Sequence, residues 1–368
     1  RDPRGSSLYP GSPLRLIRAT EEATHKVNMD RLEKGVRNQL DLQADYYFIE
    51  KKKSNCDYLR WYLTEQGLES RFDQDIHLWK EDFINALPKL IHRIDSNSKN
   101  RRCIFFLDQY GWSDVPFPDI NTIFTLLPRA EVILTMATDW LIDYMSNEPG
   151  FMKPLQKTGL DEALNIETLL NHKKDTPQWR QFVQFQLHQA IVKLTGAKHY
   201  TPFFIVSNEA NRSFWLLHLS NHPRARDVMT QLHWQLKNQF AHYGDAGFQM
   251  FGYDPSSDAQ LHGITDLFAH SEFTFDHAAR DKTLESIVVE LPNVIQQFPD
   301  GIRFDEFYRR VANFTPATTD HIKEAAHQLL QVKELEIRSP NGGMRNKAHT
   351  INNHDIIRLP KQTIFIFN

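Results

Sequence analysis

The stretch Cys103-Ile104-Phe105-Phe106-Leu107-Asp108 decides the fold of this chain. Five consecutive apolar residues run up to an acid, which is the pattern of a strand that is buried on both faces of a sheet. Such strands occur mostly in parallel sheets that helices cover on both sides. The stretch therefore predicts an α/β fold built around a largely parallel sheet.

Strand and helix patterns alternate on both sides of this stretch, which predicts a doubly wound, Rossmann-like sheet. The predicted strands are 46–50, 69–72, 103–107, 131–136, 203–206 and 214–219, and the predicted helices are 79–94, 119–127, 179–194 and 223–240, with an irregular segment before residue 179. The loop between the last two strands is too short for a crossover helix. We therefore expect these two strands to form an antiparallel hairpin at one edge of the sheet.

The chain changes character after residue 242. Residues 243–282 are rich in Gly, Asp, Ser and His and are interpreted as a connector. Three helix patterns (284–298, 303–312 and 315–332) and two strand patterns (335–338 and 356–359) follow. Three helices followed by a hairpin are the order of a winged helix-turn-helix domain. The sequence thus predicts an α/β domain at 1–242, a connector at 243–282 and a winged helix at 283–368.

Composition narrows the class of protein further. The chain has 368 residues, enough for two domains, and a net charge of −3 from 43 basic and 46 acidic residues. Any contact with nucleic acid must therefore be local rather than a bulk charge effect. Two cysteines, no apolar run of 18 residues and no signal peptide pattern predict a cytoplasmic protein. Seventeen histidines without a His-Glu-x-x-His motif favour structural histidines, and no metal site is predicted.

The candidate catalytic residues follow the buried strand as Asp108-Gln109-Tyr110-Gly111. Ligands of open α/β sheets bind outside the carboxyl ends of the strands. At such a position a carboxylate can accept a hydrogen bond from an exocyclic base amine while a neighbouring aromatic ring stacks on an extruded base. The alternative is that Asp108 caps a turn and Tyr110 packs in the core.

Two further strand ends carry acids. Glu50 ends the strand 46–50 and could accept hydrogen bonds from both hydroxyls of a ribose, because a carboxylate accepts two bonds at once. Alternatively, Glu50 is a solvated acid that pairs with one of the lysines at 51–53. Asp73 and Asp75 follow the predicted strand 69–72 and have the same ambiguity. The loop from Gly5 to Gly11 belongs to the same set of candidates.

These segments, in this order, resemble the three-Cys-motif partner proteins. That prokaryotic family has a class I, S-adenosylmethionine-dependent methyltransferase-like fold, and its members often carry a C-terminal winged helix. The resemblance extends over essentially the whole chain. It rests on Gly11-Ser12-Pro13-Leu14, Phe48-Ile49-Glu50, Phe106-Leu107-Asp108-Gln109-Tyr110-Gly111, Ser207 and Trp215-Leu216-Leu217-His218-Leu219-Ser220-Asn221-His222-Pro223.

The resemblance implies S-adenosylmethionine as methyl donor and a role for each candidate residue. Glu50 would hold the donor ribose, and Asp73 or Asp75 would lie near its adenine. Asp108, Gln109 and Tyr110 would stand in place of the Asp-Pro-Pro-Tyr-like motif of amino-methyltransferases, with Gln109 where proline is usual.

The same resemblance bears on the loop that would bind the methionine moiety of the donor. The family's Asp-x-Phe-Ala-Gly type of loop is not visible in the sequence. We expect either that this loop and its strand precede Arg1, or that the loop with Gly5 and Gly11 is its remnant. The family is named after a neighbouring protein with a three-cysteine, radical-SAM-like motif, which is a possible partner.

The predicted winged helix supplies candidate nucleic-acid contacts. Its third helix would enter the major groove, and its readers would be Thr318, Thr319, His321 and Lys323. On the wing, Arg345 and Lys347 would contact phosphates. Because Asp320 and Glu324 dilute the positive charge of that helix, and because winged helices also bind proteins, a protein partner stays an alternative.

The sequence therefore supports two functions of different classes. In the first, the chain is a methyltransferase that acts on a base amine of nucleic acid, in association with phage defence. In the second, it is a catalytically inactive methyltransferase-fold subunit that binds nucleic acid or a protein through its winged helix. A third possibility is that the three-cysteine partner performs the chemistry and this chain presents the substrate.

Overall fold

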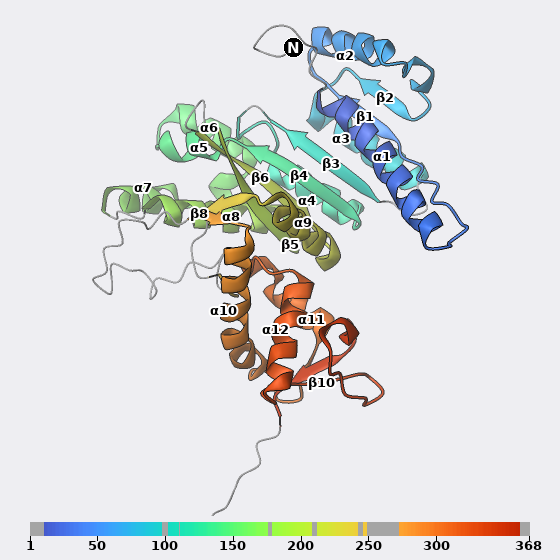
Figure 1. Cartoon of the computed structure of the whole chain (residues 1–368). Helices are drawn as coiled ribbons and strands as arrows, with labels where there is room; N and C mark the ends of the chain where they lie inside the picture. The colour runs from blue at the N-terminus through green and yellow to red at the C-terminus, as the bar shows by residue number, and fades with distance from the viewer. Residues whose placement is uncertain are drawn as a thin grey trace, which may run out of the picture. The chain divides into compact units, whose positions relative to one another are not determined.

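The computed structural model describes residues 11–97, 102–109, 111–175, 179–207, 212–241, 246–248 and 272–360. The chain divides into two compact units, Arg1–Ser96 and Asn97–Asn368, and each is described by itself (Figure 1). The division falls inside the range 1–242 that the sequence assigns to one α/β domain.

The first unit packs helices on a small parallel sheet. It contains α1 (Ser12–Glu33), β1 (Tyr46–Ile49), α2 (Lys53–Glu65), a 3₁₀ turn (Glu69–Arg71), β2 (Ile76–Trp79) and α3 (Phe83–Asn97). The strands β1 and β2 pair in parallel, from Tyr46 with Ile76 to Ile49 with Trp79. Its buried core joins α1, α2 and both strands and consists of Leu14, Ile17, Tyr46, Tyr62, Leu63 and Ile76.

The predicted strand 69–72 is wrong, because residues 69–71 form a 3₁₀ turn and the strand begins at Ile76. The reason is a chain reversal at Asp73, whose backbone has a φ of 61°. Its N–H donates to the carbonyl of Ile76 at 2.9 Å and closes the turn. Asp73 and Asp75 therefore precede β2 and lie at its amino end.

The second unit contains a mixed four-stranded sheet in the order β3-β4-β6-β5 (Figure 1). The strands are β3 (Cys103–Asp108), β4 (Ala130–Met136), β5 (His199–Ser207) and β6 (Arg212–Ser220). Only β3 and β4 pair in parallel, whereas β6 is antiparallel to both of its neighbours. The predicted hairpin at the edge is confirmed. The prediction of a mostly parallel, Rossmann-like sheet is not, because the returning strand of that hairpin lies between β4 and β5.

The strand β3 is buried on one face only, so the expectation of burial on both faces is wrong. Phe105 and Leu107 are buried, but the side chains of Ile104 and Phe106 are 56% and 51% exposed. In the sheet register, Ile104 and Phe106 lie beside Glu131 and Ile133 of β4. On β6, the next strand of the sheet, the residues in the same register are Ser220 and His218, and these two are buried. The physical reason is that β3 is an edge strand of this sheet.

The helices of this part of the second unit begin and end as follows: α4 (Phe117–Leu126), α5 (Thr138–Asp143), α6 (Pro149–Thr158), α7 (Ile166–Asp175), α8 (Trp179–Thr195) and α9 (Pro223–Leu236). The helix α4 packs on β4 and α8, and α9 packs on β5 and β6. The segment interpreted as irregular contains α5, α6 and α7. Pro149 and Pro154 fall within α6 and conceal its helical pattern.

A short antiparallel pair, β7 (Gln239–Ala241) and β8 (Glu272–Thr274), precedes the C-terminal domain. That domain runs α10 (His277–Ile295), β9 (Ile302–Arg303), α11 (Phe304–Val311), a 3₁₀ turn (Ala312–Phe314), α12 (Thr319–Gln331), β10 (Glu336–Arg338) and β11 (Ile356–Arg358), with the sheet order β10-β11-β9. This is a winged helix-turn-helix arrangement, as predicted. The helix α10 begins within the range interpreted as connector, because the side chain of Asp276 caps it by accepting from Ala279 N–H at 2.9 Å.

The winged helix has its own apolar core. Fully buried side chains from three helices and two strands meet there, among them Ile287, Phe307, Ile322, Ile337 and Ile357.

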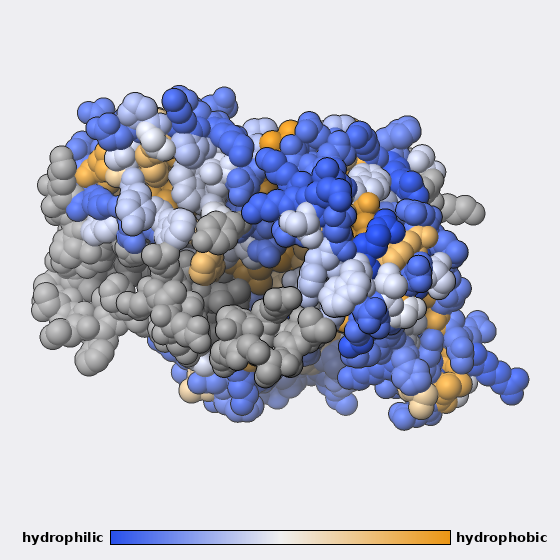
Figure 2. All heavy atoms as spheres, turned by 90° about the horizontal axis from the view of Figure 1, so that it is seen from above, coloured by the Kyte–Doolittle hydropathy of each residue, from blue (hydrophilic) through white to orange (hydrophobic). Residues whose placement is uncertain are grey.

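The face of the molecule drawn in Figure 2 is mainly hydrophilic, and its apolar residues form separate patches. No helix in the described parts of the chain is long and apolar enough to cross a membrane.

The turn between α10 and β9 depends on Gly301. Its φ is +85°, and a Cβ at this position would lie 2.7 Å from Ile356 Cγ2 and 2.8 Å from the carbonyl oxygen of Ile357. We expect Gly301→Ala to lower the free energy of unfolding by more than about 2 kcal/mol, because backbone strain and a clash with the wing add together.

The matched control is Gly342→Ala. Gly342 has nearly the same φ, +84°, but nothing lies within 4 Å of its Cβ position. This variant should lose only the cost of the left-handed backbone, about 1 kcal/mol. Urea unfolding of both variants measures the difference. Equal losses would show that β11 moves away from residue 301 at no cost.

Candidate strand-end site and nucleic-acid interface

The carboxylate of Asp108 lies at the carboxyl end of β3, where the sequence places it. Asp108 is exposed, and its Oδ1 accepts a hydrogen bond of 2.7 Å from the hydroxyl of Thr135. Thr135 is its register partner on β4, so the two parallel strands hold this pair at their common edge. Thr135 was not among the predicted site residues, although it lies near the end of the neighbouring predicted strand. The result is an acid that is fixed in position yet open to a ligand.

Gln109 shapes the loop that follows β3. Its side chain is only 6% exposed, and its Oε1 accepts from the backbone N–H groups of Asp114 at 2.9 Å and Val115 at 3.2 Å. Its own backbone N–H donates to Thr135 Oγ1 at 3.1 Å. The side-chain Nε2 is buried and has no hydrogen-bond partner among the described residues. Gln109 therefore orders residues 111–115, and Tyr110 lies outside the described residues.

Glu50 lies in the first unit, directly after β1. One carboxylate oxygen accepts from the backbone N–H of Lys52 at 2.8 Å, and the backbone N–H of Glu50 donates to Trp79 at 3.0 Å. Lys53, one of the three lysines in the alternative, pairs with Asp57 at 2.7 Å, and no ion pair of Glu50 with Lys51, Lys52 or Lys53 is found among the described residues. Glu50 thus keeps a carboxylate oxygen that no described residue engages.

Glu81 and Asp82 follow the carboxyl end of β2, and the sequence analysis missed both of them. In this parallel pair, the residues after Trp79 share an edge with Glu50. Asp82 caps α3 by accepting from Asn85 N–H at 3.0 Å, and Glu81 pairs with Lys89 at 2.7 Å. If the strand had been predicted at 76–79, Glu81 and Asp82 would have been recognised as acids that follow the carboxyl end of a strand.

Asp73 and Asp75 were predicted to lie at the carboxyl end of a strand, where a methyl donor would bind. The structure places them at the amino end of β2, so this reason for assigning them to a donor site no longer holds. Asp75 is also engaged, since the guanidinium of Arg71 donates three hydrogen bonds to it at 2.6–3.2 Å. This contact raises the pKa of Arg71. Gly11 is the N-cap of α1 with an ordinary extended backbone (φ −70°), and Gly5 lies outside the described residues.

The residues predicted to read the major groove are mostly inaccessible. Thr318 and His321 are 4% and 9% exposed, because the first turn of α12 packs on α9. The Thr318 hydroxyl accepts from His321 N–H, and His321 Nδ1 accepts from Thr318 N–H, both at 3.3 Å. Thr319 donates to Asp227 of α9. The prediction that these three side chains face solvent is wrong, because they cap or anchor the helix.

Of the remaining predicted phosphate and base contacts, Arg345 is bound to another side chain of the wing, whereas Lys347 and Lys323 are accessible. Arg345 donates two hydrogen bonds, of 2.8 and 3.0 Å, to the fully buried carboxylate of Asp355 and so stabilises the wing. Lys347 is exposed at the wing. Lys323 is half-buried, and its ammonium lies 5.5 Å from the centre of the Phe304 ring. Lys347 and Lys323 are thus the members of the predicted set that a phosphate can reach.

Buried neutral histidines line the contact between the sheet and the winged helix. Burial lowers the pKa of His199 on β5 and of His321 on α12 to about 4, and the pKa of His233 on α9 to about 3. Among the described residues, no group of three or more His, Cys, Asp or Glu side chains could hold a metal ion.

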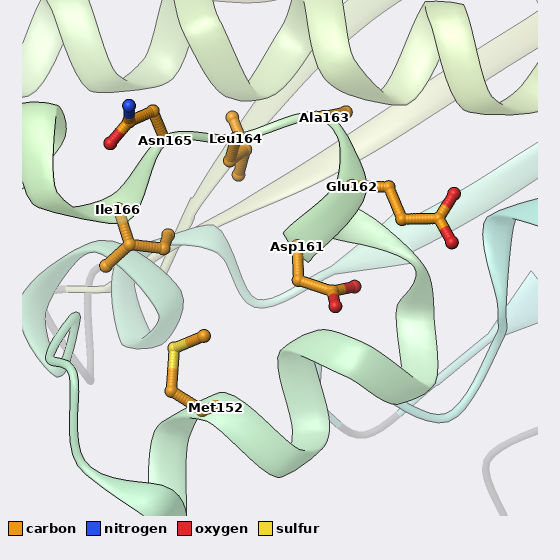
Figure 3. A pocket seen from close by; sticks show the side chains of 7 residues that line it. All are labelled: Met152, Asp161, Glu162, Ala163, Leu164, Asn165 and Ile166. Atoms are coloured by element: carbon orange, nitrogen blue, oxygen red, sulfur yellow. The ribbon is translucent and has the colours of Figure 1, made fainter.

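A separate, open depression of about 470 Å³ lies between α6 and α7 (Figure 3). Met152 contributes from α6 and Ile166 from the start of α7, and the segment between the helices contributes the others, including the carboxylates of Asp161 and Glu162 (Figure 3). None of the sequence-predicted site residues lines it.

Comparison with known proteins identifies one part of the chain. Residues 252–342 match a protein family described as GMT-like wHTH domain. The match includes α10, α11, α12 and β10 and ends before β11. No curated protein matches the chain. The winged helix is therefore established by both the fold and the comparison.

His321 makes the stability of this region depend on pH. Its pKa is near 6.5 in an unfolded chain and about 4 in the folded one, so between these values only the unfolded chain binds the proton. The free energy of unfolding should therefore fall as the pH falls from about 6.5 to about 4, by up to about 1.4 kcal/mol per pH unit from this side chain.

His321→Gln is the matching test, because Gln at this helix position can still accept from the N-cap N–H but does not titrate. Urea unfolding at pH 7 and pH 5 should show a smaller loss of stability in His321→Gln than in the unsubstituted protein. The same loss in both proteins would contradict a role for His321 in the pH dependence.

Proposed function

We propose that the chain is a nucleic-acid-binding, methyltransferase-like protein that methylates an exocyclic base amine. The observation that carries the proposal is the carboxylate of Asp108, fixed by Thr135 at the carboxyl edge of the parallel pair β3–β4 and exposed to ligands. Polar groups at this edge of an open α/β sheet are where ligands bind. The match of residues 252–342 to a winged helix family supports nucleic acid as the ligand class.

For methyl transfer, the main task of the protein is to position the base amine against the methyl donor. S-adenosylmethionine supplies an electrophilic methyl group when bound. The exocyclic amine has to present its nitrogen lone pair to that methyl group and lose one proton. Asp108 would accept a hydrogen bond from the amine and so orient it, while Thr135 fixes the carboxylate and Gln109 orders the adjoining loop.

The donor role of Glu50 is consistent with its contacts. One of its oxygens is held by a backbone N–H at 2.8 Å, which leaves acceptor capacity for a ribose hydroxyl. Asp75 does not fit such a role, because it is engaged by Arg71. Association with a three-cysteine, radical-SAM-like protein, phage defence and a cytoplasmic location are further proposals that rest on the family resemblance and on composition.

A second candidate, a catalytically inactive subunit that binds nucleic acid or a protein, is favoured by Gln109. This residue stands where the resemblance places a proline, and its side-chain carbonyl is engaged by the backbone of residues 114 and 115. The inactive subunit would keep the winged helix contacts and need no donor.

Calorimetric titration with S-adenosylmethionine and S-adenosylhomocysteine separates the two candidates. We expect both ligands to bind, and Glu50→Ala to weaken binding at least about tenfold, because a charge-assisted bond to ribose is worth about 1.5–3 kcal/mol. Asp108→Asn should bind the donor normally but lose methyl transfer by about 10²–10⁴-fold.

Glu65→Ala is the control for these variants, because Glu65 is an exposed acid at the end of α2, away from the strand edge. It should behave as the unsubstituted protein does. Absence of donor binding, or equal binding by Glu50→Ala, would favour the inactive subunit.

Nucleic-acid binding is tested separately at the wing. We expect Lys347→Ala to weaken binding to unrelated sequences uniformly and to reduce the slope of log K against log [salt] by about 1, as loss of one phosphate contact does. Lys153→Ala, which removes an exposed lysine from α6, should leave the slope unchanged. Equal slopes for both variants would remove the wing from the interface.

A further inference from the structure

The first turn of α12 is held against α9 by a fully buried carboxylate. Asp227 of α9 is 0% exposed. Its two oxygens accept from Thr319 N–H at 2.8 Å and from the Thr319 hydroxyl at 2.9 Å. Thr319 is the first residue of α12, so this carboxylate engages one of the free N–H groups at the positive end of the helix dipole.

Other bonds close the same contact around it. The guanidinium of Arg226 donates to the carbonyl of Thr315 at 2.9 Å, and the indole N–H of Trp234 donates to the carbonyl of Pro316 at 2.8 Å. The Trp234 ring also meets the ring of His321 edge to face, with centroids 4.9 Å apart. Main-chain and side-chain groups from residue 315 to residue 321 are thus engaged by α9.

A second pair of hydrogen bonds joins the winged helix to the start of β5. The side chain of Asn313 accepts from Tyr200 N–H at 3.2 Å and donates to the carbonyl of Lys198 at 2.8 Å. The loop that leads into α12 is therefore fixed on both sides, to α9 and to the sheet.

This contact occupies the part of a winged helix that reads DNA. Recognition helices contact base edges with their N-terminal residues, and helix N-termini bind phosphate through free N–H groups. Here Thr318 and His321 are buried, and the carboxylate of Asp227 takes the place that a phosphate oxygen would take. In the docked arrangement, α12 cannot enter a groove by its first turn.

The contact also buries charge that it compensates only in part. Arg226 is fully buried, and its Nε and Nη1 have no hydrogen-bond partner among the described residues. Burial lowers its pKa. Release of α12 would return Arg226 and Asp227 to water and recover the hydration that docking removes.

We propose that the docked winged helix is a closed state, in which Asp227 caps α12 in place of nucleic acid, and that binding of duplex DNA requires the first turn of α12 to leave α9. The inference rests on the proposed nucleic-acid binding. Duplex DNA is the expected ligand of the released helix, because the B-form major groove admits an α-helix and the narrow A-form groove of duplex RNA does not.

The test opens the contact without harming the helix. Thr319→Pro removes both donors to Asp227, and proline is well tolerated at the first position of a helix. The preceding residue, Thr318, already has the extended backbone (φ −85°, ψ 167°) that a following proline requires. Asp227→Ala is the second variant: it removes the acceptor of the same two bonds and also the acceptor of Arg224, Gln231 and Tyr308.

Lys53→Pro is the matched control. Lys53 is the first residue of α2 and is exposed, and Lys52 before it is extended (φ −83°, ψ 123°). It carries the same substitution at the same helix position, in the first unit.

Two readouts are measured on the full chain: amide hydrogen exchange at residues 318–322, and affinity for duplex DNA and duplex RNA of one sequence at fixed salt. We expect both Thr319→Pro and Asp227→Ala to exchange faster at α12 and to bind duplex DNA at least about tenfold more tightly, with no gain for RNA. Lys53→Pro should change neither readout.

The outcomes that overturn the inference differ from those that overturn nucleic-acid binding. Faster exchange without a gain in DNA affinity, or unchanged exchange in both variants, would show that docking does not inhibit α12. An equal gain for RNA would show that the released helix does not act through the B-form major groove. If affinity stays constant but still depends on Lys347, the proposed nucleic-acid binding stands and only the closed state fails. If no variant with an opened contact binds DNA or RNA, both proposals fail.

Discussion

The arrangement of the second unit depends on a carboxylate that has been removed from water. An isolated buried charge is costly, and the oxygens of Asp227 accept from Thr319, from the guanidinium of Arg224 at 2.8 Å, and from Gln231 and the Tyr308 hydroxyl. The donors come from α12 and α11 of the winged helix and from α9 itself. In the docked arrangement, the winged helix and α9 each supply groups that satisfy buried polar atoms of the other.

Local elements followed from the sequence wherever apolar periodicity was strong. The strands predicted at 103–107 and 131–136 and the order of elements in the winged helix are confirmed, because each pattern is continuous and lies between clear turn signals. The strand 69–72 was not, since the conformation of one residue, Asp73, reverses the chain before the strand begins. The exposure of Phe106 could not be predicted either, because a hydrophobic run does not show whether its strand is central or at an edge.

The same distinction applies to the candidate sites. Asp108 could be placed from its own strand, and its partner Thr135 could have been found by aligning the ends of neighbouring strands. The burial of Thr318 and His321 could not, because it is decided by residues of α9 about 90 positions earlier in the chain. The buried stripe of α9 is itself polar, with Arg226, Asp227, Thr230 and His233. Sequence patterns assign such residues to solvent, so the contact has no apolar signature.

The exposed flank of β3 has a practical consequence for anyone who prepares fragments of this protein. Edge strands that present apolar side chains and unpaired main-chain groups are sites at which chains aggregate. Ile104 and Phe106 are of this kind, and no proline or charge interrupts the strand before Asp108. A fragment cut near residue 97 would begin a few residues before this edge. Its solubility, rather than its folding, would then limit what can be learned from it.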